Sequence, residues 1–207
     1  MFDDTLARFA KDISMDSKIF FGITSIIFSF AQFTPYIRDI LKRKTHPHAF
    51  SWFVWGLPCS IVFAAQVSAG AGPGAWATAF TTIACTLIFL LSLKYGERDL
   101  HFIDWICLLL ALLALILWDI TKDPLSAVVL ITLSDVLGFG PTIRKSILKP
   151  EDETMSSYFI ASIKWIFALF ALNKMTLVLW LYPVSMIVAN WFLVLVLMRK
   201  YTLKPST

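Results

Sequence analysis

Two charged residues lie deep inside long apolar stretches of the chain. Asp135 falls within the stretch 125–147 and Lys164 within the stretch 158–172. A charged side chain in the middle of a membrane helix is costly, and it usually faces a partner charge or a water-filled cavity. Asp135 precedes Pro150 by 15 residues and Lys164 follows it by 14, so two antiparallel helices would bring both to a similar depth. We therefore expect the carboxylate and the ammonium group to touch.

Such a pair has two interpretations, and the sequence leaves both open. The two charges form a charged or proton-linked binding site, or they are a structural ion pair that pins two helices together. Trp165, which follows Lys164 directly, and Trp55 are candidate walls of a pocket around the charges.

The other reactive residue types show no pattern typical of catalysis, metal binding or redox chemistry. Cys59, Cys85 and Cys107 each lie in an apolar stretch, without a CxxC motif or a Cys/His spacing. The apolar stretches contain no nucleophile with a base and no carboxylate pair. No basic run with interleaved aromatic residues indicates nucleic-acid binding. We expect no cofactor, no metal ion and no enzymatic activity.

The composition is that of an integral membrane protein. Apolar residues make up 58% of the chain and charged residues 15%, with a mean hydropathy of +0.74, whereas about a quarter of a soluble domain is charged. The apolar blocks are about 18–22 residues long, which is the length that crosses a bilayer as a helix. They predict seven transmembrane helices, at 19–40, 50–68, 75–93, 102–118, 125–147, 158–172 and 177–198. Residues 1–18 have the spacing of a short amphipathic helix at the membrane surface.

The two halves of the chain repeat each other at an offset of 106 residues. Six pairs recur without a gap, namely Phe33 and Phe139, Pro35 and Pro141, Ile37 and Ile143, Arg38 and Arg144, Ser51 and Ser157, and Phe53 and Phe159. The predicted fold is therefore an all-α membrane protein with seven transmembrane helices, in which two parallel three-helix repeats are joined by a linker helix. Its units are residues 19–95, 96–124 and 125–201, followed by a tail at 202–207.

The offset also relates candidate functional residues. Ser29 is the counterpart of Asp135, and we include it among the candidate substrate-binding residues. Pro35 and Pro141 each remove a backbone hydrogen bond and kink their helices, and their repetition makes them candidate hinges.

A seven-span chain arranged as three, one and three helices, with a proline late in the first helix of each triplet, resembles the SWEET and PQ-loop transporter superfamily. The resemblance covers about residues 19–200, although the Pro-Gln signature is replaced by Pro35–Tyr36 and Pro141–Thr142. Vitamin-precursor transporters of the PnuC type are similar in architecture. Sugar-transporting members carry a pocket asparagine in the last helix of each triplet. Asn190 stands at the second of these positions, so the resemblance implies a role in substrate binding for it.

The placement of lysine and arginine predicts the orientation in the membrane. With the N-terminus outside, twelve of these residues fall on the inner side and five on the outer side. We expect an N-terminus outside and a C-terminus in the cytoplasm, in a bacterial inner (cell) membrane. The predicted function is transport or facilitated passage of a small polar, sugar-like solute by alternating access at a central pocket. A seven-helix receptor or sensor of the same fold is the alternative, and assembly into a homo-oligomer is left open.

Overall fold

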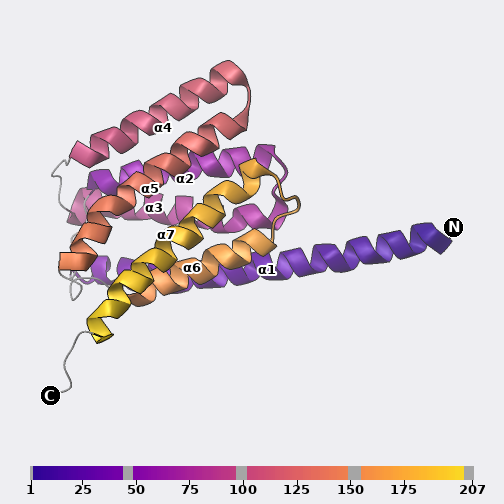
Figure 1. Ribbon diagram of the computed structural model, residues 1–207, viewed down its shortest axis with the longest axis horizontal. Helices are drawn as coiled ribbons and strands as arrows, with labels where there is room; N and C mark the ends of the chain where they lie inside the picture. Colours follow the sequence, from indigo (N-terminus) through magenta and orange to yellow (C-terminus); the bar gives the residue numbers. More distant parts are fainter. Residues whose placement is uncertain (1, 44–48, 97–101, 149–154, 203–207) are drawn as a thin grey trace.

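The computed structural model describes residues 2–43, 49–96, 102–148 and 155–202, which form helices joined by short turns. The described residues contain no strand, and the expectation of an all-helical chain with seven α-helices is confirmed. Six of the helices begin within three residues of their predicted starts. In chain order the elements are α1 (Phe2–Leu41), α2 (Ala49–Ser68), the 3-10 turn η1 (Gly72–Ala75), α3 (Trp76–Tyr95), α4 (Phe102–Thr121), α5 (Pro124–Leu148), α6 (Met155–Phe170) and α7 (Leu177–Thr202) (Figure 1).

Helix α1 is longer than the sequence pattern indicates. A separate surface helix was expected over residues 1–18, but residues 2–18 continue into the first span as one helix of 40 residues. No glycine or proline occurs between Phe2 and Phe21, so nothing in the sequence ends the first helix and starts another. The N-terminal part of α1 projects beyond the other helices (Figure 1).

Three helical segments have the length, and the bundle has the apolar surface, of an integral membrane protein. Three segments are long and apolar enough to cross a bilayer, namely Met15–Leu41, Gly72–Tyr95 and Leu177–Arg199, and four shorter apolar helical segments accompany them within the described residues. Large apolar side chains point away from the bundle. On α1 alone, Phe20, Ile23, Ile27 and Phe30 lie at helical spacing and are 49–63% exposed. An apolar band of this kind is stable against lipid chains and unfavourable in water.

Each triplet of helices packs in the same order. In the first triplet, α3 packs along both α1 and α2, whereas the described backbones of α1 and α2 do not approach each other and the two helices meet through side chains such as Tyr36 and Trp52, whose ring centres are 5.2 Å apart. In the second triplet, α7 packs along both α5 and α6, and the described backbones of α5 and α6 do not approach each other. The third helix of each triplet therefore lies between the first and the second.

The contacts between the two triplets are symmetric. When α1, α2 and α3 are replaced by their counterparts α5, α6 and α7, and the reverse, the same pairs of helices are in contact. Helix α1 packs on α6 as α5 packs on α2, and α3 touches α6 as α7 touches α2. Helix α4 packs along α5 and α2 on the outside of this arrangement, and the two chain ends lie at opposite ends of the molecule (Figure 1).

Candidate functional site

A cavity of about 250 Å³ lies between the two triplets. All six helices of the triplets line it, and the lining contains no residue of α4. The lining residues of α2 and α6 fall within 52–59 and 157–165, and none of them lies in the last five residues of either helix. The cavity therefore extends from the middle of the bundle toward the end where these two helices begin. The lining consists of Gln32, Phe33, Trp52, Trp55, Cys59, Thr81, Cys85, Asp135, Phe139, Ser157, Tyr158, Ala161, Lys164, Trp165, Tyr182, Met186 and Asn190.

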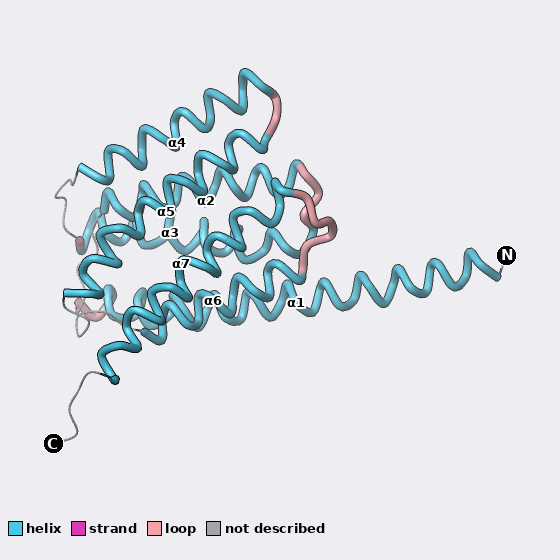
Figure 2. Tube along the Cα trace, viewed as in Figure 1, coloured by secondary structure: helices cyan, strands magenta, loops and turns pink. Residues whose placement is uncertain are grey.

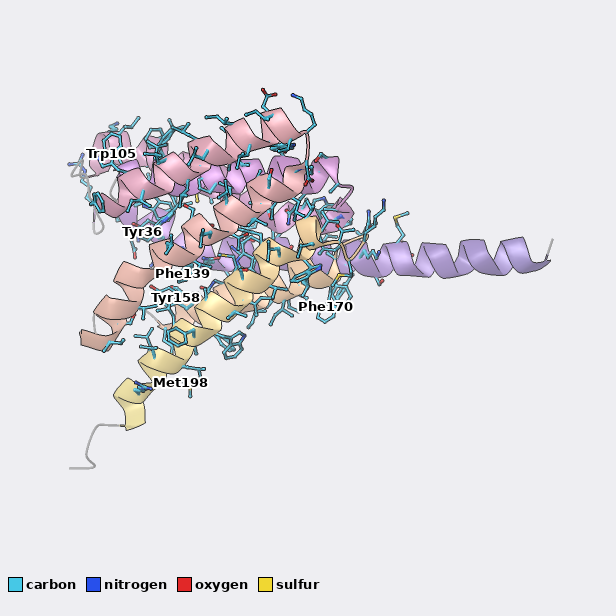
Figure 3. The ribbon with its side chains drawn as sticks, turned by 45° about the horizontal axis from the view of Figure 1, so that its top comes forward. Tyr36, Trp105, Phe139, Tyr158, Phe170 and Met198 are labelled. Carbon is cyan, nitrogen blue, oxygen red and sulfur yellow. The ribbon has the colours of Figure 1, made fainter. Side chains whose placement is uncertain are left out.

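Positions related by the 106-residue offset meet across this cavity. Four pairs of lining residues are related in this way, namely Phe33 and Phe139, Trp52 and Tyr158, Trp55 and Ala161, and Cys59 and Trp165. Figure 3 shows Phe139 on α5 and Tyr158 on α6 near one another, while Trp105 on α4 lies away from them. Equivalent faces of the two triplets are thus turned toward the same space.

Lys164 is a buried amine at the wall of the cavity. Its side chain is 1% exposed, and its Nζ donates a hydrogen bond of 3.2 Å to Oγ1 of Thr81 on α3. The Nζ atom also lies over two aromatic rings, 4.5 Å from the ring centre of Trp165 and 5.3 Å from that of Phe33. The electron-rich faces of these rings attract a cation. One hydroxyl and two rings hold the amine, and they leave its other hydrogen-bond donors available to the cavity.

Asp135 lines the same cavity and has a different partner from Lys164. Its Oδ2 accepts a hydrogen bond of 2.8 Å from the Tyr182 hydroxyl, and that hydroxyl lies 3.5 Å from Sγ of Cys59. The structure describes both Asp135 and Lys164 and shows no ion pair between them, so the direct contact expected from their depth is not formed. The reason is the packing order, because α7 lies between α5 and α6 and separates the helices that carry the two charges.

Two amides add hydrogen-bond acceptors to the lining. The Oε1 atom of Gln32 is buried and has no hydrogen-bond partner among the described residues. Asn190 donates its Nδ2 to the backbone carbonyl of Met186 at 2.7 Å, which leaves its Oδ1 as the polar atom available to the cavity. A buried acceptor without a donor costs about 1–3 kcal/mol. A bound molecule that carries donors would remove this cost.

Most of the predicted site residues meet at this cavity. Asp135, Lys164, Asn190, Trp165 and Trp55 all line it. Ser29 does not belong to the lining, since it is fully buried and its hydroxyl donates to the carbonyl of Ser25 in its own helix. The two candidate hinge positions, Pro35 and Pro141, lie within the continuous helices α1 and α5.

The sequence interpretation missed several lining residues. Tyr182 is the most informative of these, because it contacts both Asp135 and, edge to face at 5.3 Å, the ring of Trp165. A tyrosine next to Pro183 in the apolar first two turns of α7 was a detectable signal, because a buried phenol usually has a hydrogen-bond partner. Phe33 and Phe139 were visible as a repeated pair, but the offset alone does not say which way they face. Thr81 carries no signal of its own in the sequence.

The opposite end of the bundle is closed by contacts between the triplets. The turn between α2 and α3 lies against the turn between α6 and α7 (Figure 2), and the backbone N–H of Asn173 donates to the carbonyl of Ala71 at 3.0 Å. Nζ of Lys18 donates to the Asn173 carbonyl at 2.9 Å. The two turns can lie this close only because residue 74 is a glycine. A Cβ atom on Gly74 would lie 2.5 Å from Cδ2 of Leu172. This set of contacts is called the end closure below.

Neither metal chemistry nor similarity to known proteins adds to this description. Within the described part of the chain, no three His, Cys, Asp or Glu side chains are grouped so as to hold a metal ion. No protein-family model, curated protein or solved structure matches the chain.

Proposed function

We propose that this protein is a seven-span membrane transporter that carries a small polar solute by alternating access. The observation that carries the proposal is the cavity between the triplets, whose apolar walls hold a buried amine and a carboxylate that do not pair with each other. Unpaired charges destabilise a bundle, so a protein that needed only a stable bundle would do better with apolar side chains there. Ionisable groups within membrane helices are typical of substrate and ion pathways.

The symmetry of the packing supports a transporter made of two parallel repeats. The helix contacts exchange between the triplets, and four pairs of lining positions are related by the same 106-residue offset. In the proposed arrangement residues 19–95 and 125–201 move against each other around a shared site, and α4 is the linker. Rocking of two repeats around a fixed central site is the usual mechanism of such transporters. This packing supports the proposed resemblance to the SWEET and PQ-loop superfamily.

The end closure supports the assignment of this structure to one state of the alternating-access cycle, in which the cavity is closed at one end. The cavity extends toward one end of the bundle, and a few backbone and van der Waals contacts close the other end. Contacts of this kind can separate without unfolding a helix. In the proposed orientation, with the N-terminus outside and the C-terminus inside a cell membrane, the closed end is the outer one. Pro35 and Pro141 are the proposed hinges of α1 and α5.

Uptake into proteoliposomes tests the proposal. The purified protein is reconstituted, and labelled sugars, amino acids and nucleosides are offered one class at a time. We expect saturable uptake of one class that equilibrates across the membrane and is competed by the same solute unlabelled. Saturable binding without uptake of any solute would instead identify a receptor of this fold.

A further inference from the structure

The polar groups of the cavity fall into two sets of opposite charge. Lys164 supplies a cation whose one hydrogen bond within the described residues goes to Thr81. Asp135 supplies a carboxylate that, in the part of the chain that the structure describes, accepts one hydrogen bond, from Tyr182 to Oδ2. The structure describes both residues and shows no ion pair between them. Neither charge is therefore neutralised by the other.

The hydrogen-bond donors and acceptors that remain unused in the cavity determine which chemical groups a ligand needs. The amine of Lys164 requires an anionic acceptor, because it has hydrogen-bond donors left and no acid beside it. The carboxylate of Asp135 and the buried Oε1 of Gln32 require donors, and a cationic donor suits the carboxylate best. A neutral polyol would leave both charges uncompensated. A simple anion would be repelled by Asp135 and a simple cation by Lys164.

The size and walls of the cavity limit the rest of the ligand. Its volume of about 250 Å³ is below the range of about 300–1,000 Å³ that is usual for drug-sized ligands. The walls between the charges are aromatic, with Trp52 and Trp55 edge to face at 5.3 Å and Trp165 against Tyr182 at 5.3 Å. Such walls suit a small apolar or aromatic side group.

We propose that the ligand is a small zwitterion of the amino-acid type, with its carboxylate on Lys164 and its ammonium group on Asp135. The inference rests on the transport function proposed above only for the passage of the ligand, since binding itself needs no transport. The two fixed charges select by repulsion as well as attraction, because a molecule that lacks either charge leaves a buried group uncompensated. Tyr182 holds the carboxylate of Asp135 in position and acts as a positioning residue.

Calorimetric binding to the purified full-length protein tests this assignment. The probes are L-alanine, L-leucine and L-phenylalanine, each compared with the amine that lacks its carboxylate and with the acid that lacks its amino group. Glucose serves as the neutral polyol. We expect at least one zwitterion to bind at least about 100-fold more tightly than both of its single-charge analogues. Equal binding of an analogue, preferred binding of glucose, or no binding of any zwitterion to folded protein overturns the proposal.

Two variants assign the charges to the ligand groups. In Lys164→Met the preference for the zwitterion over the amine should disappear, and in Asp135→Asn the preference for the zwitterion over the acid should disappear. Lys122→Met removes an exposed amine outside the cavity and should change neither ratio. The wild-type series decides the matter even if a variant does not fold.

The outcome separates this inference from the transport function. Tight zwitterion binding without flux in proteoliposomes leaves the ligand class standing and contradicts transport. Flux of a sugar or nucleoside without zwitterion binding contradicts the ligand class and leaves transport standing.

Discussion

Substitution of Gly74 should force the end closure apart. In Gly74→Ala the new Cβ atom would lie 2.5 Å from Cδ2 and 2.9 Å from Cα of Leu172, whereas carbon atoms pack best at about 3.5–4.0 Å. The conflict involves backbone, so a side-chain rotation does not relieve it. Overpacking of this kind costs about 1–3 kcal/mol. The cost applies to the closed state alone, so it should shift the equilibrium toward an open outer end by about 5- to 150-fold.

A thiol in the cavity reports the shift. Cys85 lines the cavity, and a variant that keeps only this cysteine is treated from outside with a small, membrane-impermeant thiol reagent. We expect Gly74→Ala to raise the rate at which the reagent modifies Cys85 by about 5- to 150-fold. Gly70→Ala is the control, because it lies in the same turn at φ +77° with open space around its Cβ, and so strains the backbone without pressing on Leu172. Equal rates in Gly74→Ala and Gly70→Ala would refute the account of the closure.

Two further predictions concern the site and the orientation. Tyr182→Phe removes the donor to Asp135 and should lower the free energy of unfolding in detergent by about 1–3 kcal/mol. The control Tyr95→Phe, at the end of α3, should change that free energy by no more than about 0.5 kcal/mol. Equal losses in the two variants would contradict the role of the Tyr182 hydroxyl. A single cysteine placed at Lys44 should react with impermeant reagents only from the inside, and one at Lys174 only from the outside. The reverse result would invert the orientation inferred from charge.

Local composition was enough to predict where six of the seven described α-helices begin. Apolar blocks of membrane-spanning length bounded by charged or glycine-containing turns locate the starts of α2 to α7 to within three residues. The start of α1 was placed wrongly because polarity changes near Lys18 while the helix does not end there. A change of polarity marks where a helix leaves an apolar environment, and only a break in backbone hydrogen bonding marks where it stops.

The two candidate charges line one cavity, but the contact predicted between them is not formed. Counting residues from Pro150 placed Asp135 and Lys164 at similar depth, and both do line one cavity. Their expected contact failed because helices adjacent in sequence need not be adjacent in space, and α7 occupies the position between α5 and α6. The rotation of each helix about its axis depends on packing across the whole bundle. This rotation decides that the Ser29 hydroxyl bonds within its own helix, whereas the Thr81 hydroxyl reaches Lys164 on another helix.

The central claim is that solute crosses the membrane through one cavity whose two ends open in turn. The most direct test is flux through proteoliposomes that contain an Ala71→Cys, Asn173→Cys variant in which Cys59, Cys85 and Cys107 are replaced. The backbones of positions 71 and 173 are hydrogen-bonded at 3.0 Å, so a disulfide between them should lock the end closure. We expect saturable flux in the reduced variant, its loss on oxidation and its recovery on reduction. Flux that continues unchanged with the disulfide formed would contradict the account.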